Sequence, residues 1–306
     1  MKRLALCCLF LEAPIRFRTT TVRYLLTIKS KGEDPLEYLD AIIISNLENL
    51  LLAVDFCSDH GIRAFRINSG LLPVYTHPEC GYQIDDLPSS KSIRAAFEKV
   101  KSRAIANNIR LSFHPDQFVV LNSPKEDVVD RSIEELEYHG LMANLLGADV
   151  INIHGGGGYG DKVGALKRFA ENFRRLSDRV QGLLTVENDD RVYTPEDLLP
   201  LCEKIKIPLV YDVHHHRCLP DNLNVAQATE RALSTWNREP LFHISSPKEG
   251  WAEKNPRLHH DFIDINDVPI EWREIENLTI DIEAKAKEIA VMRLYDQLLK
   301  QGWNLA

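Results

Sequence analysis

The chain has 306 residues, of which 44% are hydrophobic and 27% are charged, and its formal net charge at pH 7 is -8. This size and composition predict one soluble globular domain without low-complexity stretches, and we identify no apolar run long enough to span a membrane. The acidic balance argues against a nucleic-acid partner without excluding one, because bound metal ions and a locally basic face can offset an acidic average.

The first predicted strand covers residues 3–8, within an apolar start that could be mistaken for a secretion signal. The segment is short for a signal, and Glu12 and Pro14 follow it directly. We therefore interpret it as the first strand of the domain.

Short strands and helices alternate along the rest of the chain. Apolar runs of strand length predict eight strands, at residues 3–8, 64–69, 110–115, 150–155, 183–188, 208–213, 241–245 and 278–283. Apolar residues with a period of 3.6 predict helices at residues 40–61, 89–108, 125–148, 160–178, 194–206, 222–236 and 286–301, and a weak one at 267–275. Because this alternation is typical of parallel strands joined by helical crossovers, we predict an α/β fold, a single TIM-type (β/α)8 barrel over residues 1–306. An open doubly wound sheet is the alternative.

The cysteines are dispersed and include no CxxC pair. They are Cys7, Cys8, Cys57, Cys80, Cys202 and Cys218. This spacing predicts reduced thiols in an intracellular, cytoplasmic protein, and it disfavours a structural zinc ribbon. The ligand types worth pursuing are therefore His, Asp and Glu.

Six predicted strands lead directly into a metal-type ligand. These ligands are His114, His154, Glu187, Asp212, His243 and Glu283, and the loops add His215 and His259. A β/α barrel delivers the carboxyl ends of all its strands to one face, so these side chains should meet there. Imidazoles and carboxylates without thiolates suit Zn, Mn, Fe or Co and hydrolytic chemistry. We predict two or three divalent ions that share a bridging carboxylate, with Glu187 as the bridge. The alternative is that half of these residues are core residues or hydrogen-bond partners of the ligands.

The motifs in this chain resemble those of the ultraviolet damage endonucleases, which are similar to endonuclease IV and more distantly to xylose isomerases. The matching stretches are FRTTTVR (17–23), AFRINSGLLPVYTHP (64–78), LSFHPDQFVVLNSP (111–124), NIHGGGGYGDK (152–162), LTVENDDR (184–191), VYDVHHH (210–216), FHISSPKE (242–249), HHDFI (259–263) and IEAKAKE (282–288). The resemblance implies a DNA repair enzyme that incises damaged double-stranded DNA 5′ to pyrimidine dimers and 6-4 photoproducts. It implies no membrane partner, and we expect a monomer.

The resemblance also implies how the ligands are shared among metals. His114, His154 and Glu187 would hold one ion, and Glu187, Asp212, His243 and Glu283 a second. His215 and His259 would hold a third, with help from Asp261. Four of these residues, His114, Glu187, Asp212 and Glu283, are the implied catalytic set. Manganese is the first choice for the metal, and zinc, cobalt and iron are the alternatives.

Lesion recognition is implied for a second set of residues. In the family a glutamine and an aromatic residue fill the gap left by two flipped damaged bases, and here those are Gln117 and Phe118. The alternative for Phe118 is an apolar residue that leads into a buried strand. His77 is similar to a family active-site histidine. Arg18, Arg23 and Arg66 are predicted phosphate or lesion contacts, although arginines that pair with barrel carboxylates would look the same in sequence.

Two positions depart from the family pattern. Leu6 stands where a tyrosine of the lesion pocket is expected, and Leu241 replaces a lysine two residues before His243. Pocket polarity and any role of that lysine therefore do not carry over. An abasic-site endonuclease, a metal-dependent sugar isomerase and a non-catalytic metal-binding scaffold remain as alternative functions.

Overall fold

A computed structural model describes the whole chain, Met1 to Ala306, and contains one sheet of eight parallel strands. The strands are β1 (Lys2–Cys7), β2 (Ala64–Ile67), β3 (Arg110–Phe113), β4 (Val150–His154), β5 (Leu184–Glu187), β6 (Leu209–Val210), β7 (Leu241–Ile244) and β8 (Leu278–Ile282). Each of the eight predicted strands is therefore confirmed, with ends that differ by at most a few residues.

The sheet closes into a barrel through the residues that follow its two outer strands. Its order is β6-β5-β4-β3-β2-β1-β8-β7, and β6 and β7 are joined by a parallel bridge between Asp212 and His243. The backbone N–H of His243 donates to the carbonyl of Tyr211 at 3.0 Å. The TIM-type barrel is confirmed, and the open-sheet alternative is wrong.

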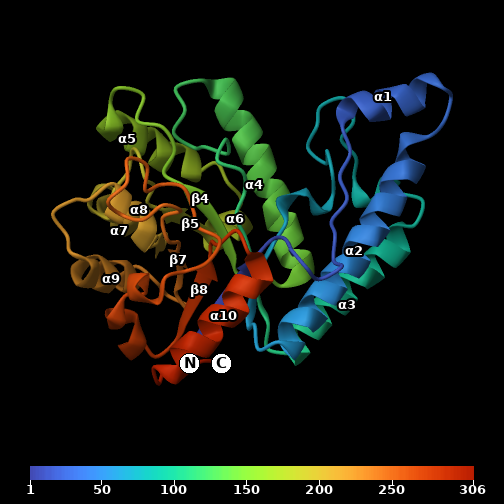
Figure 1. Ribbon diagram of the computed structural model, residues 1–306. Coiled ribbons are helices and arrows are strands. Elements are labelled where there is room, and N and C mark those ends of the chain that lie inside the picture. The colour runs from blue at the N-terminus through green and yellow to red at the C-terminus, as the bar shows by residue number, and fades with distance from the viewer.

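The chain also forms ten helices, most of which cover the outside of this barrel (Figure 1). They are α1 (Val22–Ser30), α2 (Pro35–Asp59), α3 (Ser90–Ala106), α4 (Glu126–Leu146), α5 (Lys162–Phe173), α6 (Asp178–Leu183), α7 (Pro195–Ile205), α8 (Val213–Cys218), α9 (Val225–Ser234) and α10 (Lys287–Lys300). The chain termini lie together at the bottom of the view, and α1 lies at the opposite end, at the height where α4 and α5 begin.

The helix predictions differ from the structure at a few places. α2 begins at Pro35, earlier than expected, because the Asp34 side chain caps the N–H of Leu36 and proline suits the first helical position. Helices α1, α6 and α8 were not predicted. The weak helix at 267–275 is wrong: two 3-10 turns, Ile265–Asp267 and Ile270–Glu274, lie on either side of Pro269.

Helix α2 is 25 residues long and apolar enough to cross a membrane by length and composition alone. The expectation that no run reaches that length is therefore wrong. The helix buries ten residues, from Leu39 to Cys57, and packs beside α3 against the barrel. Burial of this apolar face in the domain core accounts for its composition.

A buried carboxylate anchors the segment that follows β1. The two Glu288 oxygens accept backbone N–H groups of Leu11, Glu12 and Ala13 at 2.7 to 3.0 Å. Burial alone would raise the pKa of the Glu288 carboxyl, but these three donors hold the pKa below its ordinary value. The contact ties α10 to the beginning of the chain, in keeping with β1 as a strand of the domain.

Apolar side chains form a floor inside the barrel. Val150, Val210 and Leu241 are almost fully buried and pack together as a separate small cluster. Leu241 lies two residues before His243 on β7. Ligand-type side chains at the strand ends therefore stand above a dry, well-packed layer, which limits their movement.

Candidate metal centre

Seven of the eight ligand-type residues gather at the strand ends, with Glu187 at the end of β5 shared between groups, and His259 lies outside these groups beside Glu283. His114 Nε2 lies 3.1 Å from Glu187 Oε2, while His215 Nδ1 and His243 Nδ1 each lie 3.2 Å from Oε1. Asn152 Nδ2 donates to Oε2 at 2.5 Å. Glu187 is fully buried, so one carboxylate is held by side chains from β3, β4, α8 and β7.

The residues after β6 present two further candidates through a helix cap. Asp212 Oδ1 accepts the backbone N–H of His215 at 2.6 Å and so begins α8, the short helix that carries His215. The second oxygen, Oδ2, is buried and makes no hydrogen bond. The Asn188 side chain exchanges two hydrogen bonds of 2.9 Å with the Asp212 backbone, so it takes the place of strand pairing there.

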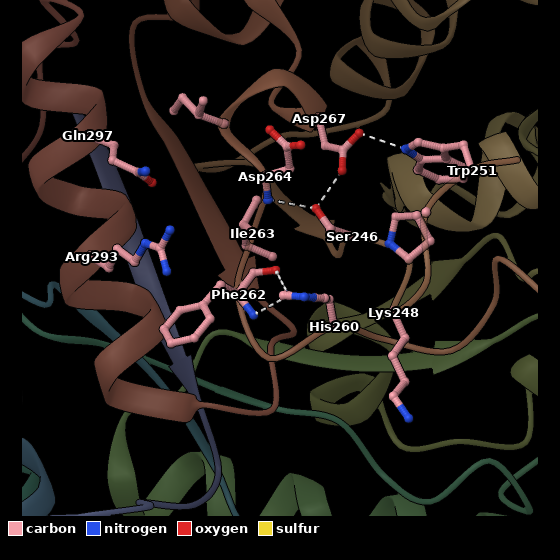
Figure 2. Close-up of a pocket in the computed structure, with 13 residues that line it drawn as sticks. Ser246, Lys248, Trp251, His260, Phe262, Ile263, Asp264, Asp267, Arg293 and Gln297 are labelled. Atoms are coloured by element: carbon pink, nitrogen blue, oxygen red, sulfur yellow. Dashed lines mark hydrogen bonds between the residues drawn. The ribbon is translucent and has the colours of Figure 1, made fainter. Parts of the chain in front are cut away.

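His259 reaches the centre from the long connection between β7 and β8. Its Nδ1 lies 3.8 Å from Glu283 Oε2, and it forms an antiparallel bridge with Pro247. Figure 2 shows how this connection is held: Asp267 accepts from Ser246 Oγ at 2.5 Å and from Trp251 Nε1 at 2.8 Å. Beside these contacts lies a cavity of about 440 Å³ bordered by α10.

Ligand-type atoms gather in three groups whose members lie within 4.8 Å of one another. The groups are His114 with Glu187 and His243, His154 with Glu187 and His215, and Asp212 with His243 and Glu283. Glu187 belongs to two of them, which agrees with its predicted bridging position. His215 lies with His154 here, whereas the resemblance pairs it with His259, and the rings of His215 and His259 are 6.4 Å apart. How the ions divide these ligands stays a prediction.

Several buried polar atoms in the cluster lack a hydrogen-bond partner. They include His154 Nδ1 and Asp212 Oδ2. Burial lowers the pKa of His154, so its ring is neutral and free to donate a lone pair. Burial by itself would lower the pKa of His243, but the neighbouring Glu187 carboxylate outweighs burial and raises this pKa to about 9. Without metal the cluster therefore holds protons, and divalent cations that prefer His and carboxylate ligands fit the same positions.

The predicted wedge residues stand out from the surface beside this centre. The Asp116 side chain accepts the backbone N–H of Phe118 at 3.0 Å, and this turn leaves Gln117 and Phe118 exposed. The Phe118 residue is 76% exposed, so it is not a core residue. Phe118 and His77 border one cavity of about 760 Å³ between the β2–α3 connection and α4.

The three predicted arginine contacts divide into two kinds. Arg18 and Arg23 are exposed, in the segment that leads into α1 and on α1 itself. Arg66 instead lies inside the barrel, where its Nη1 is 2.6 Å from Glu283 Oε1 and 3.5 Å from Asp281 Oδ2. This is the pairing with barrel carboxylates that the sequence left open.

Sequence reasoning missed the residues that support the ligands. Asn152 and Asn188 orient Glu187 and Asp212, and both lie inside motifs that were identified for the ligands beside them. The buried Asp281 was not singled out because it reads as one polar residue in an apolar strand. Leu6 is fully buried in the main hydrophobic core, so it does not line an open pocket.

Comparison with known proteins gives a consistent result. The chain matches the model of the UV-endonuclease UvdE family over residues 2–302. A UV DNA damage endonuclease from Bacillus velezensis is 34% identical over 302 residues, which cover 95% of this chain and 91% of the relative. The crystal structure of SacUVDE superimposes with a TM-score of 0.84 at 27% identity, covering 99% of this chain and all of that one. Endonuclease IV from Thermus thermophilus shares the fold, with a TM-score of 0.60 at 17% identity over 82% of this chain and 94% of its own.

Proposed function

The chain belongs to the UV-endonuclease UvdE family, and from that premise we propose that it incises the DNA backbone 5′ to ultraviolet photolesions by metal-assisted hydrolysis. The observation that carries this proposal is the convergence of three groups of His, Asp and Glu ligand atoms around Glu187. An enzyme of this family acts on DNA, and its nuclease activity agrees with a ligand set suited to hydrolysis.

The residues of the cluster have distinct tasks in the proposed reaction. Bound divalent ions supply charge neutralisation of the phosphodiester and a water whose pKa is lowered. Glu187 would be shared between the ions, because its two oxygens face different histidines. Asp212, the N-cap residue of α8, offers its free Oδ2. We assign His114, Glu187, Asp212 and Glu283 to the catalytic set, with manganese as the preferred metal and two or three ions in total.

Recognition of the lesion falls to the exposed turn at Gln117 and Phe118. An aromatic ring and an amide that project beside the metal cluster can fill the space of two extruded bases. A cross-linked dinucleotide is already poorly stacked, so extruding it costs less than extruding sound bases. His77 borders the same cavity as Phe118, and we assign it to contacts with the displaced nucleotides.

Contacts to the duplex beyond the lesion are assigned to α1 and the segment before it. Residues 13–32 contain no Asp or Glu, in a chain whose net charge is -8. Arg18, Arg23 and Lys29 are exposed and have no carboxylate partner. α1 lies at the end of the molecule where α4 and α5 begin (Figure 1), the end to which β3 and β4 carry their ligands, and we assign these cations to the duplex bound there. They would bind phosphates independently of sequence.

Incision of a labelled duplex with one pyrimidine dimer tests the proposal. We expect cleavage on the 5′ side of the dimer that disappears with a chelator, which removes the ions, and with Glu187→Gln, which removes the carboxylate that two of the ligand groups share. Full activity after either treatment would contradict the metal mechanism. An abasic duplex and a set of aldoses serve as parallel substrates, and preference for one of those would favour an abasic-site endonuclease or a sugar isomerase instead.

A further inference from the structure

Asp281 on β8 is a buried carboxylate that the proposed mechanism does not use. The residue is fully buried, and neither of its oxygens makes a hydrogen bond. It is also absent from the three groups of ligand atoms around Glu187. A buried charge without compensation is strongly unfavourable, so its retention calls for a partner.

Two groups face the Asp281 carboxylate. His243 Nε2 lies 3.4 Å from Oδ2, and Arg66 Nη1 lies 3.5 Å from the same oxygen. Arg66 is engaged more closely with Glu283, at 2.6 Å. In the register of the sheet His243 pairs directly with Asp281, so the two side chains stand next to each other on adjacent strands. His243 is therefore the side chain that is available to interact with Asp281.

The two ring nitrogens of His243 face different surroundings. Nδ1 lies 3.2 Å from Glu187 Oε1 and 3.5 Å from Glu283 Oε1, on the side of the metal cluster. Nε2 faces Asp281. A histidine that binds a metal through one nitrogen commonly donates its other N–H to a carboxylate, which fixes the tautomer and the orientation of the ring.

We propose that Asp281 is a positioning residue that, in the metal-bound protein, accepts the Nε2–H of His243 and thereby keeps the Nδ1 lone pair directed at the metal centre. The inference rests on the metal centre of the proposed function. Strand β7 provides no substitute, because Leu241, the residue below His243, packs with Val150 and Val210 in the apolar floor. The carboxylate next to His243 Nε2 therefore comes from the adjacent strand, β8.

Metal affinity in a graded series of variants tests this role. Asp281→Asn keeps an acceptor oxygen but loses the charge, and Asp281→Leu loses both. We expect Co²⁺ and Mn²⁺ to bind about tenfold more weakly to the first variant and about a hundredfold more weakly to the second, as measured by calorimetry. The visible absorption of bound Co²⁺ should change in the leucine variant, because the His243 ring is no longer held.

Thr279→Val is the matched control. Thr279 lies two residues before Asp281 on β8, and its hydroxyl contacts Glu239 and Arg110 rather than His243. It should lower the denaturation midpoint while leaving Co²⁺ affinity and absorption unchanged. A purely structural role for Asp281 predicts the same behaviour in its variants, so unchanged affinity and spectrum in Asp281→Leu would overturn the inference.

Binding of Co²⁺ and Mn²⁺ to the wild-type protein distinguishes failure of the Asp281 inference from failure of the proposed metal centre. Wild-type protein that binds neither ion would overturn both the metal centre and the role of Asp281. Wild-type protein that binds them, with both Asp281 variants matching it, would overturn the role of Asp281 alone. Circular dichroism of each variant without metal establishes that it is folded.

Discussion

The barrel is built from two segments whose strand ends carry different chemistry. In residues 110–283, here the ligand segment, β3 to β8 each lead into a His, Asp or Glu of the candidate metal centre. In residues 1–109, here the N-terminal segment, β1 ends at Cys7 and β2 presents Arg66. The ligand segment thus supplies candidate metal ligands, and the N-terminal segment contributes a partly buried cation, Arg66.

This difference indicates a division of labour. Arg66 pairs with Glu283 and Asp281, so the N-terminal segment balances part of the negative charge that the ligand segment gathers. The N-terminal segment also carries α1, with its exposed basic residues, at the end where the ligands lie. We expect the ligand segment to control chemistry and lesion selection, and the N-terminal segment to control affinity for the duplex as a whole.

Removing the wedge tests whether lesion selection and metal binding are separable within the ligand segment. We expect Gln117→Ala with Phe118→Ala to bind a dimer-containing duplex about a hundredfold more weakly, because stacking against bases is lost. Metal content should equal that of the wild type, since both side chains are exposed and neither belongs to the groups of ligand atoms. Fluorescence anisotropy and elemental analysis measure the two quantities.

The control for the wedge variant is Ile105→Ala, which truncates an apolar side chain that is 70% exposed near the end of α3. This change should leave lesion binding unchanged. Loss of metal from the Gln117 and Phe118 variant would mean that these residues are structural, and the proposed separation within the ligand segment would fail.

Removing positive charge from α1 tests whether the N-terminal segment controls affinity for the DNA duplex. Neutralising Arg23 and Lys29 to glutamine removes two predicted phosphate contacts, so the slope of log affinity against log salt should fall by about 1.8. Affinity should fall about equally for damaged and undamaged duplexes, because phosphate contacts carry no lesion information. Incision at saturating DNA should keep its rate.

Lys204→Gln with Lys300→Gln provides the same charge change elsewhere. Both lysines are exposed and lie in the last turns of α7 and α10, at the other end of the barrel. An identical loss of salt dependence in this control would attribute the effect to net charge rather than to α1, and would remove the distinction drawn for the N-terminal segment.

The sequence predicted the parts of this molecule that depend on pattern. Apolar runs defined the strands, and the ligand at the end of each run defined the cluster, since barrel topology brings strand ends together. The sequence could not show whether Arg66 contacts DNA at the surface or pairs with carboxylates inside the barrel, because arginine occurs in both environments. It also extended the strand at 208–213 too far, because the cap formed by Asp212 turns the chain into α8 after Val210.

Supporting contacts lay beyond the reach of sequence for a physical reason. Asn188 replaces strand pairing with side-chain hydrogen bonds to Asp212, and Asp281 faces His243 from the adjacent strand. Both depend on register and on the direction of side chains within the barrel. Spacing along the chain carries neither kind of information, whereas it does carry the alternation of strands and helices.

The smallest expected effect concerns Glu288, which joins α10 to the N-terminal segment. Glu288→Gln weakens three hydrogen bonds that a buried carboxylate accepts, so the free energy of unfolding should fall by roughly 1 to 3 kcal/mol near neutral pH. The control Glu253→Gln, at an exposed position, should change the free energy of unfolding little.

The effect of Glu288→Gln should also depend on pH. Because the pKa of Glu288 in the folded protein lies below its ordinary value of 4.5, the carboxylate stabilises the fold above that value. Its contribution is lost as the pH falls through the folded pKa, so the difference from Glu288→Gln should shrink below about pH 4.5. Denaturant unfolding of the chelated proteins between pH 4 and 7 measures this, and a difference that stays constant with pH would mean that the carboxylate charge does not hold the two segments together.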